Sequence, residues 1–202
     1  MSDGVITDIA ALEALYGTPG EASLIKVADH LTPLYAQWVM ASRFCVFCTV
    51  GPEGTDGSPR GDDGPVVQML DPKTLLMPDW RGNNRMDTLR NIVEDERISL
   101  MFLVPGSNNV IRINGTAVVS TAQDLIGRFA QDGRHPRSVV VITVAEVYSQ
   151  CARALMRARL WTSGDESAGL PSVGELLKEQ KDSFDDQSYD AEWATRAKAT
   201  MW

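Results

Sequence analysis

The sequence predicts a mainly β protein with peripheral helices, an α+β arrangement built around a six-stranded antiparallel barrel. Six runs of β-branched and aromatic residues are separated mostly by short segments of turn-forming residues, as in successive hairpins. Only two helix-like segments interrupt the strands, so the regular alternation of strand and helix that is typical of parallel sheets is missing. The glycine motifs of parallel nucleotide-binding folds, GxGxxG after a strand and GxxxxGK before Ser or Thr, do not occur in the sequence.

Two helices are expected before the first strand. Residues 7–16 place apolar side chains at helical spacing behind a Thr7 or Asp8 cap, and residues 17–20, rich in Gly and Pro, end this helix. A second helix is predicted over 22–41, with Pro33 near a turn boundary or a kink. We expect these helices to form an arm that leads into the barrel.

The first three strands are expected before residue 78. Residues 44–50 are β-branched and aromatic, and residues 51–57 are dense in turn formers, which predicts a hairpin loop. The next strand should cover 66–70, turn, and return through 74–77.

A helix separates the third predicted strand from the fourth. Met86, Leu89, Ile92 and Val93 recur three and four residues apart, which predicts an amphipathic helix over 86–93. The following segments are predicted as two strands about a turn, a helix capped by Thr121, and a strand with apolar residues on both faces: residues 97–104, 109–120, 121–130 and 138–148.

After the last strand the composition changes twice. Residues 150–161 are basic and predict a helix or a turn, whereas the chain beyond residue 164 is acidic, with a final helix near 173–181 and a polar tail. We therefore divide the chain into an N-terminal helical arm, a barrel domain and a C-terminal helical extension: residues 1–41, 42–161 and 162–202.

The overall composition excludes several classes of protein. The 202 residues carry a formal net charge of −8 with a pI near 4.8, which argues against a nucleic-acid binder because affinity for the phosphate backbone needs a broad basic surface. Neither a long apolar run nor a basic segment followed by an apolar one occurs, so we expect no membrane span and no signal peptide. Three cysteines are too few for a disulfide framework. We therefore expect a cytoplasmic protein.

The loop 79–85 has the composition of an anion site. It lies between an apolar strand and the helix that starts near Met86, and it holds Arg81, Gly82 and Arg85. A helix start leaves backbone N–H groups unpaired and carries partial positive charge, and arginine can bind phosphate oxygens two at a time. The loop therefore suits a phosphate group.

Other arginines can join this loop at one mouth of the barrel. One lies in the segment 58–62 and another in the strand 109–120. The guanidinium groups could then surround one phosphate, with Asn84 and backbone amides completing its hydrogen bonds: Arg60, Arg81, Arg85 and Arg112. The alternative is that these arginines form internal ion pairs, Arg85 with Asp87 or Glu94 and Arg60 with Asp62.

The chain has few residues for acid–base or nucleophilic chemistry. Cys45 and Cys48 lie three apart in a predicted strand and so point to opposite faces, which favours buried structural cysteines over a metal or redox site. The two histidines lie in no pattern typical of hydrolysis. A bound cofactor is therefore expected to supply the chemistry, and the phosphate is expected to belong to it. Trp80 and Trp161 could border its ring system, or anchor a core or a dimer interface.

Together these motifs resemble those of the pyridoxamine 5'-phosphate oxidase-like family of flavin-binding split barrels, over about residues 40–161. The segments that carry the resemblance are Ser58–Asp62, Arg81–Asn91, Asp95–Leu100 and Arg112–Gly115. They are similar to a bacterial subgroup of uncharacterised members with Ser-Pro-Arg-Gly-Asp and Gly-Asn-Asn-Arg motifs. The resemblance implies a six-stranded split barrel that forms a homodimer and binds FMN in clefts at the subunit interface.

The resemblance also implies which residues hold the cofactor. They come from the strand that lines the flavin, the loop that holds its phosphate, a second strand of the barrel and the closing segment: Ser58, Arg60, Val66, Val67 and Gln68; Pro78, Asp79, Trp80, Arg81, Asn84 and Arg85; Arg112 and Asn114; and Arg157, Arg159 and Trp161. It assigns no catalytic side chain and no metal ligand.

The chain departs from the authentic oxidase in two places. It reads Gly64-Pro65-Val66-Val67-Gln68-Met69 where the oxidase has Arg-x-Val-Leu-Leu-Lys, and the C-terminal signature Arg-Leu-x-Pro is not evident. The resemblance therefore implies an FMN-dependent oxidoreductase acting on an unknown small molecule, and it argues against vitamin B6 oxidation. The alternative is a non-catalytic module that binds FMN, a deazaflavin or haem for storage or sensing.

Overall fold

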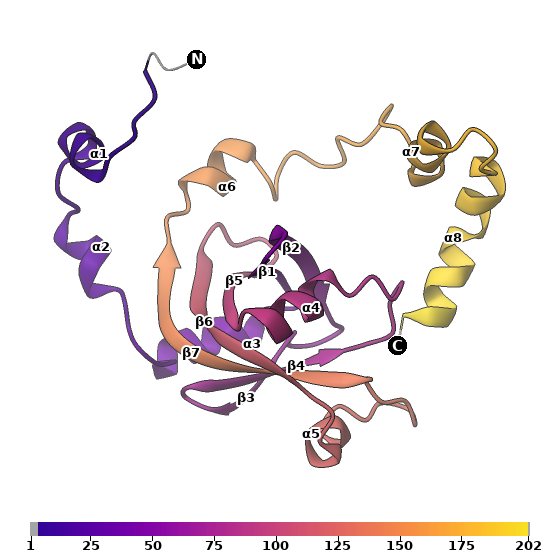
Figure 1. The fold of residues 1–202 in the computed structure, drawn as a ribbon, viewed down its shortest axis with the longest axis horizontal. Coiled ribbons are helices and arrows are strands. Elements are labelled where there is room, and N and C mark those ends of the chain that lie inside the picture. Colours follow the sequence, from indigo (N-terminus) through magenta and orange to yellow (C-terminus); the bar gives the residue numbers. More distant parts are fainter. Residues whose placement is uncertain (1–3, 202) are drawn as a thin grey trace.

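The computed structural model describes residues 4–201 (Figure 1). Seven strands form one antiparallel sheet in the order β2-β1-β5-β6-β7-β4-β3. The strands are β1 (Phe44–Gly51), β2 (Gly54–Gly61), β3 (Gln68–Asp71), β4 (Thr74–Asp79), β5 (Arg97–Leu103), β6 (Val110–Ser120) and β7 (Ser138–Gln150). The helices are α1 (Ile9–Tyr16), α2 (Glu21–Ile25), α3 (Pro33–Ala41), α4 (Asp87–Glu94), α5 (Gln123–Gly127), α6 (Arg153–Ala158), α7 (Val173–Gln180) and α8 (Asp186–Thr200).

The strand count is seven and not the six predicted, because β2 covers part of the predicted loop 51–57 and continues to residue 61, where no strand was predicted. β2 pairs with β1 along its whole length, from Gly61 opposite Phe44 to Gly54 opposite Gly51. Its glycines and Pro59 lower its β-propensity, so composition alone indicates a loop. An edge strand tolerates proline, since one side of it needs no hydrogen-bonding partner.

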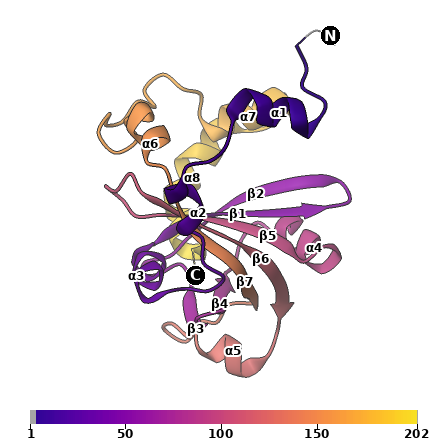
Figure 2. The ribbon, with the colours of Figure 1, turned by 90° about the vertical axis from the view of Figure 1, so that its left-hand side faces the viewer.

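Side chains join β2, at one edge of the curved sheet, to β4, the strand next to the other edge. β2 is an edge strand, yet the Nη1 of Arg60 on β2 lies 3.0 Å from the Oδ1 of Asp79 on β4. Beside this pair the indole N–H of Trp80 donates to a carboxylate oxygen of Asp62 at 3.1 Å. The sheet therefore curls into a split barrel whose gap lies between β2 and β4 (Figure 2).

The interior of the barrel is apolar. Cys45 and Phe47 of β1 are buried in it, while Val46 between them faces outward and is half-buried. The same core reaches α3 through Val39 and α4 through Ile92. A smaller cluster packs α5 against the outer side of the sheet: Leu76, Ile126 and Val139. Alternate residues of β1 therefore face the core.

Three helical segments differ from the prediction. The helix expected over 121–130 is the shorter α5, whose cap residue is Ala122 and which lacks the predicted Thr121 side-chain cap. The helix expected over 22–41 is divided into α2 and α3, because the Thr32 hydroxyl caps α3 and Pro33 occupies its first turn. Between the two helices Ala28 pairs with Val147 of β7. The expected polar tail contains α8, which begins at an Asp185 cap. The boundary at residue 41 stays a prediction, and the ends of the two proposed extensions, residues 1–3 and 202, lie outside the described residues.

The helices outside the barrel bury little of their surface. Of the residues in α1, α2, α6, α7 and α8, only Gly174 is buried. α7 and α8 pack against each other. Figures 1 and 2 show α1 and α7 on opposite sides of the molecule, both beyond the same end of the barrel. Within residues 4–201, every helix is too short or too polar to cross a lipid bilayer.

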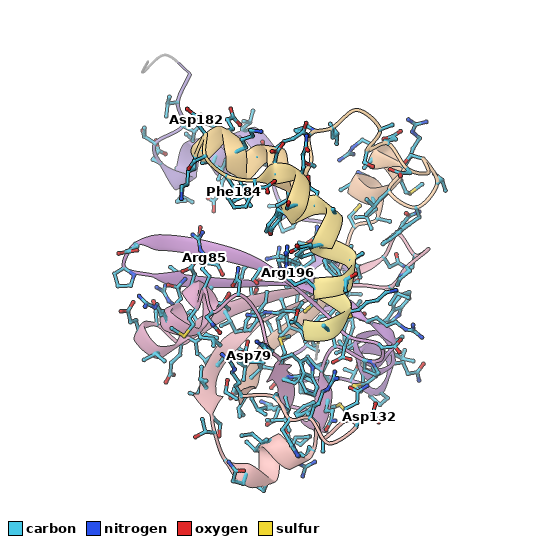
Figure 3. All side chains as sticks on the ribbon, turned by 90° about the vertical axis from the view of Figure 1, so that its right-hand side faces the viewer. Asp79, Arg85, Asp132, Asp182, Phe184 and Arg196 are labelled. Carbon is cyan, nitrogen blue, oxygen red and sulfur yellow. The ribbon has the colours of Figure 1, made fainter. Side chains whose placement is uncertain are left out.

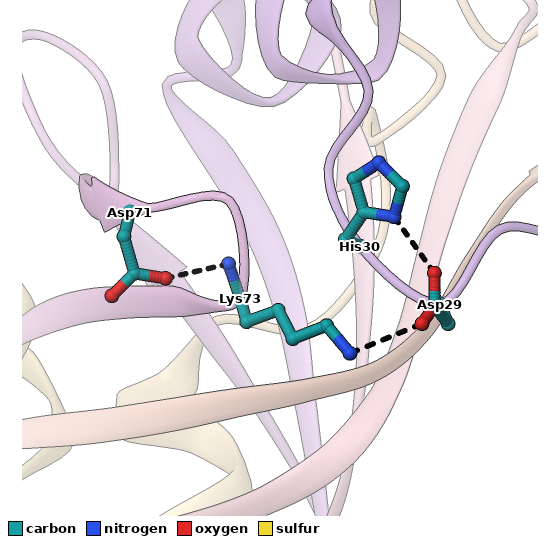
Figure 4. A network of polar contacts seen from close by, with 4 residues as sticks. All are labelled: Asp29, His30, Asp71 and Lys73. Carbon is teal, nitrogen blue, oxygen red and sulfur yellow. Dashed lines mark hydrogen bonds and ion pairs between the residues drawn. The ribbon is translucent and has the colours of Figure 1, made fainter.

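A polar network fixes the segment between α2 and α3 to the β3–β4 turn (Figure 4). Asp29 accepts a hydrogen bond from Lys73 Nζ at 3.0 Å and lies 2.7 Å from His30 Nδ1. Asp71 accepts from the Lys73 backbone N–H at 2.7 Å. The hydrogen bonds from His30 and Lys73 lower the pKa of Asp29 from 3.8 to about 2.

We expect Asp29→Asn to destabilise the protein near neutral pH and to have less effect in acid. A carboxyl whose pKa is lowered by folding contributes stability above its unfolded pKa of 3.8, and this contribution is lost as the pH falls toward about 2. Urea unfolding at about pH 6 and about pH 2.5 should show the difference between variant and parent shrinking at the lower pH. Glu179→Gln is the control, since Glu179 is exposed and forms no ion pair within residues 4–201. A difference that does not change with pH would contradict the prediction.

The three cysteines should differ in reactivity. Cys45 is buried, Cys48 is half-buried on the opposite face of β1 as predicted, and Cys151 is exposed. Burial raises the pKa of the Cys45 thiol to about 12, so its reactive thiolate form is scarce at neutral pH. A thiol reagent followed by mass spectrometry should modify Cys151 first and Cys45 only after unfolding. Labelling of Cys45 in the native protein at the rate of Cys151 is the contrary result.

Candidate functional site

A cleft opens where the barrel is split. Its volume is about 520 Å³, within the range of about 300–1,000 Å³ that is usual for small-molecule sites. β2 forms one wall, the loop after β4 and the start of α4 form the other, and the start of β7 closes one end. The lining residues are 56–60, 79–80, 82–89 and 137–138.

The Arg60–Asp79 ion pair lies in the wall of this cleft. The side chains are only 24% and 17% exposed, and their nitrogen and oxygen are 3.0 Å apart. The alternative that Arg60 pairs with Asp62 is therefore wrong. The Asp62 carboxylate instead accepts a hydrogen bond from the Trp80 indole N–H. The Arg60 Nε is buried and has no hydrogen-bond partner within residues 4–201. A buried donor without a partner lowers the stability of the protein. A ligand atom that accepts a hydrogen bond from this nitrogen would remove that cost and be held in place.

The loop between β4 and α4 is held from β7. Asn84 has a φ of 61°, in the left-handed region that asparagine tolerates. Its side-chain oxygen accepts from Arg137 Nη1 at 2.6 Å, and the Arg137 backbone N–H donates to the Asp79 carbonyl at 3.1 Å. Asn83 accepts from the backbone N–H of Arg85 at 3.0 Å. These contacts place Arg85 and Arg137 at the same loop.

Arg85 forms one of the ion pairs considered from the sequence. Its Nε lies 2.5 Å from Asp87 Oδ2, and this hydrogen bond raises the pKa of the guanidinium. The Arg85 side chain is 78% exposed, and exposed ion pairs contribute little to stability. A phosphate with two negative charges can therefore compete with Asp87 for Arg85. Figure 3 shows Arg85 and Asp79 on the face of the molecule that α8 crosses.

The start of α4 leaves backbone amides at the cleft. Its cap residue, Met86, makes no side-chain capping hydrogen bond, and residues 86–89 line the cleft. The Thr88 hydroxyl fixes this turn to β2 by donating to Asp56 Oδ2 at 2.6 Å. The helix start thus has the free N–H groups on which the predicted anion site depends.

The structure brings together only some of the residues assigned from the sequence. Those that line the cleft are Ser58, Arg60, Asp79, Trp80, Asn84 and Arg85. Val67 and Gln68 line a neighbouring hollow of about 330 Å³, which shares Trp80 with the cleft. Val66 and Pro78 are buried, and Arg81 is exposed outside the cleft lining.

Two further groups lie elsewhere in the chain. Arg112 stands over the Tyr148 ring at 5.4 Å on the outer face of β6, where Asn114 donates to Glu146 at 2.5 Å. The remaining three residues lie at or after α6, where Trp161 donates to the Ser107 carbonyl at 2.7 Å and Arg159 lies 3.7 Å from Glu166: Arg157, Arg159 and Trp161. In a single chain, Arg60 and Arg85 share the cleft, whereas Arg81 and Arg112 are outside its lining.

Sequence reasoning missed Arg137, which supplies a third guanidinium to the cleft. The only sequence feature that marks Arg137 is its position directly before the predicted strand 138–148. The residue reaches the loop because β7 pairs with β4 with Ser138 opposite Asp79. Knowledge of that pairing would have placed Arg137 beside the loop.

The residues that line the cleft are better suited to binding a ligand than to catalysis by their own side chains. Arg60, Arg85 and Arg137 provide positive charge, which Asp56, Asp79 and Asp87 partly balance. Neither histidine nor cysteine is among the lining residues, so the cleft has no ordinary pairing of nucleophile and base. A ligand that binds there must bring its own reactive group.

Comparisons with known proteins identify similar sequences and folds. Residues 31–151 match the family model described as pyridoxamine 5'-phosphate oxidase. No curated protein matches the sequence. A variant of HupZ from Group A Streptococcus has a similar fold, with a TM-score of 0.50, 18% identity, and coverage of 59% of this chain and 99% of that one.

Two other solved structures are more distant in fold. An FMN-binding protein from Syntrophomonas wolfei has a TM-score of 0.43 at 13% identity, over 61% of this chain and 84% of its own. General Stress Protein 26 from Bacillus anthracis has a TM-score of 0.44 at 12% identity, over 56% of this chain and 88% of its own.

Proposed function

Because this chain belongs to the pyridoxamine 5'-phosphate oxidase family, matched over residues 31–151, we propose that its cleft binds FMN and that the protein is an FMN-dependent oxidoreductase. The observation that carries the proposal is the pair of guanidinium groups, Arg85 and Arg137, at the uncapped start of α4. Two positive charges and free amides suit a terminal phosphate with two negative charges. A mononucleotide has such a phosphate.

The cleft lining also has features that fit a polar aromatic ring. Trp80 and Leu89 supply apolar surface to it, and Arg60 supplies a buried Nε donor that has no hydrogen-bond partner within residues 4–201. The isoalloxazine ring has carbonyl and nitrogen acceptors that can accept such a hydrogen bond. The residues present therefore fit both the phosphate and the ring of FMN.

Each residue has a distinct role in this proposal. When bound, FMN supplies a ring that accepts and returns electrons or a hydride. Arg60 stabilises negative charge on the reduced ring, and Asp79 holds the Arg60 side chain in place through the 3.0 Å ion pair. Arg137 orients the loop through Asn84. The substrate is a small molecule whose identity we leave open.

The resemblance implies two further properties, which we include in the proposal. The first is a homodimer with FMN at the subunit interface, which would place a second copy near the cleft. The second is a cytoplasmic location, which fits three free cysteines, two of them not buried. Vitamin B6 oxidation is not part of the proposal, since the lysine of the oxidase strand is missing here.

Spectroscopy and turnover test the proposal in two steps. The purified protein, or apoprotein mixed with FMN, should show flavin absorbance that dithionite bleaches, and mass spectrometry should identify the bound molecule as FMN. Steady oxidation of NADH or NADPH with an acceptor then supports an enzyme. Bound FMN without any turnover would favour a storage or sensing module. A protein that neither contains nor takes up FMN would overturn the proposal, and bound deazaflavin or haem would replace its cofactor.

A further inference from the structure

We propose that the hollow beside the cleft binds the body of the small-molecule substrate, and that this substrate is a flat, mainly apolar carboxylate. The hollow is the one of about 330 Å³ that shares Trp80 with the cleft. The inference rests on the proposed function, since it treats the cleft as the place of the FMN ring, and it adds the chemical class of the molecule that meets that ring.

The hollow and the cleft adjoin at two cross-links between two segments of the chain. Arg60 Nη1 lies 3.0 Å from Asp79 Oδ1, and the Trp80 indole N–H donates to Asp62 Oδ2 at 3.1 Å. The first pair lines the cleft, Asp62 lines the hollow, and Trp80 lines both. A molecule bound in the hollow therefore lies next to the part of the cleft where Trp80 and Arg60 suit the ring.

The walls of the hollow are held in place by contacts within the chain. The side-chain amide of Gln68, at the start of β3, donates to the Arg128 carbonyl at 3.2 Å and ties the segment after α5 to the sheet. Phe129 packs against the smaller apolar cluster, and the backbones of Gln131 and Arg134 exchange two hydrogen bonds, of 3.0 and 2.8 Å. The hollow is thus formed before a ligand arrives, as is usual for small-molecule sites.

The apolar part of the lining suits the body of a flat ligand. It is contributed by Met40 at the end of α3, Val67 before β3, Trp80 after β4 and Phe129 after α5. Two of these side chains are aromatic, and aromatic rings pack favourably against other rings, either offset-stacked or edge to face. A ligand with a planar ring can therefore fill the hollow without leaving polar atoms of its body unpaired.

The charged part of the lining favours one negative charge on the ligand. Within residues 4–201 its ionisable side chains are Asp62 and Arg128. Asp62 holds the wall, because its carboxylate accepts from the Trp80 indole and, at 2.7 Å, from the Asp63 backbone N–H. The Arg128 side chain is exposed and forms neither an ion pair nor a hydrogen bond among the described residues. A carboxylate matches the planar fork of that guanidinium in shape and charge.

Two other classes of ligand fit the hollow less well. A phosphate monoester carries two negative charges, and the Asp62 carboxylate in the same lining opposes the second of them. An amine is attracted to Asp62 but repelled by Arg128, and the Asp62 carboxylate already accepts two hydrogen bonds. A flat carboxylate places its charge at Arg128 and its apolar body toward Trp80, so it uses both parts of the lining.

The experiment uses the full chain loaded with FMN, benzoate as the probe, and benzamide as its uncharged analogue. Benzoate should bind saturably, more tightly than benzamide, and should shift the absorbance spectrum of the bound flavin. Arg128→Gln should weaken benzoate binding by at least about tenfold, because a charge-assisted pair is lost, and should leave benzamide binding nearly unchanged. Arg134→Gln is the matched control, since Arg134 is an exposed arginine outside the lining and its substitution removes the same charge.

Three results would overturn the inference and leave the proposed cofactor intact, because all are measured on FMN-loaded protein. They are the absence of saturable benzoate binding, an equal effect of the two arginine substitutions, and a flavin spectrum that bound benzoate does not change. The last result would show that the site does not adjoin the ring. A chain that takes up no FMN fails the proposed function instead. Benzoate titration of that apoprotein, followed by tryptophan fluorescence in the parent and in Arg128→Gln, then decides whether the hollow is a carboxylate site.

Discussion

Replacing Arg85 and Arg137 together with alanine should weaken FMN binding by at least about 100-fold. Each guanidinium can form charge-assisted hydrogen bonds with the phosphate, which are worth about 1.5–3 kcal/mol, and about 1.4 kcal/mol corresponds to a factor of ten. The Arg137 Nη1 also donates to the Asn84 side-chain oxygen at 2.6 Å, so the substitution loosens the loop between β4 and α4 as well. Calorimetric titration of the apoprotein with FMN measures the effect, and titration with riboflavin, which lacks the phosphate, should show almost no difference between variant and parent.

The matched control for these substitutions is Arg97→Ala. Arg97 is an exposed arginine that pairs with an aspartate two residues away, Asp95, just as Arg85 pairs with Asp87, but it lies outside the cleft. It should leave FMN affinity unchanged. An equal loss in the Arg97 variant would indicate a general effect of net charge, and an unchanged affinity in the double variant would mean that the phosphate binds elsewhere.

Gly115→Ala should destabilise the fold by about 3 kcal/mol, at the upper end of the usual cost of overpacking. Gly115 lies where the register between β6 and β7 shifts. A Cβ atom there would overlap the carbonyl oxygen of Thr143, and it would stand 3.1 Å from the Thr143 carbonyl carbon and 3.2 Å from the Ala145 nitrogen. These are backbone atoms, so no side-chain rotation can relieve the overlap.

Gly57→Ala provides the matched control for that substitution. Gly57 is also a strand glycine, in β2, but its added Cβ would meet only Cys48 Sγ, at an ordinary 3.9 Å. Its effect should be small, and the lower entropy of the unfolded chain favours alanine there. Urea unfolding of both variants measures the free energies. Equal stability of the two variants would mean that the β6–β7 bulge relaxes freely and would contradict the prediction.

Most of the fold was predictable because runs of β-branched and aromatic residues between turn-forming segments indicate strands. Phe47, Leu100, Ile113 and Ile142 lie in predicted strands, and all are buried in the barrel. β2 was missed because its edge position removes the need for apolar alternation and tolerates Pro59. α8 was missed because none of its residues is buried, so its sequence has no apolar stripe to detect.

The candidate site was predictable only in part. The loop 79–85 is marked in the sequence by arginines and a glycine before a helix, and all of its residues except Arg81 line the cleft. The assignments of Arg81, Arg112, Arg157, Arg159 and Trp161 as cofactor residues stay predictions, since they lie outside the cleft lining of their own chain.

The sequence by itself determined the family, the positions of six strands and the arginine-rich composition of one loop, because these depend on residues close together in the chain. Tertiary structure alone decided that Arg60 faces Asp79 and that Arg137 reaches Asn84. Those contacts join residues that are 19 and 53 positions apart, and they follow from the register in which distant strands pair. That register is set by how the whole apolar core packs, so no local pattern reports it.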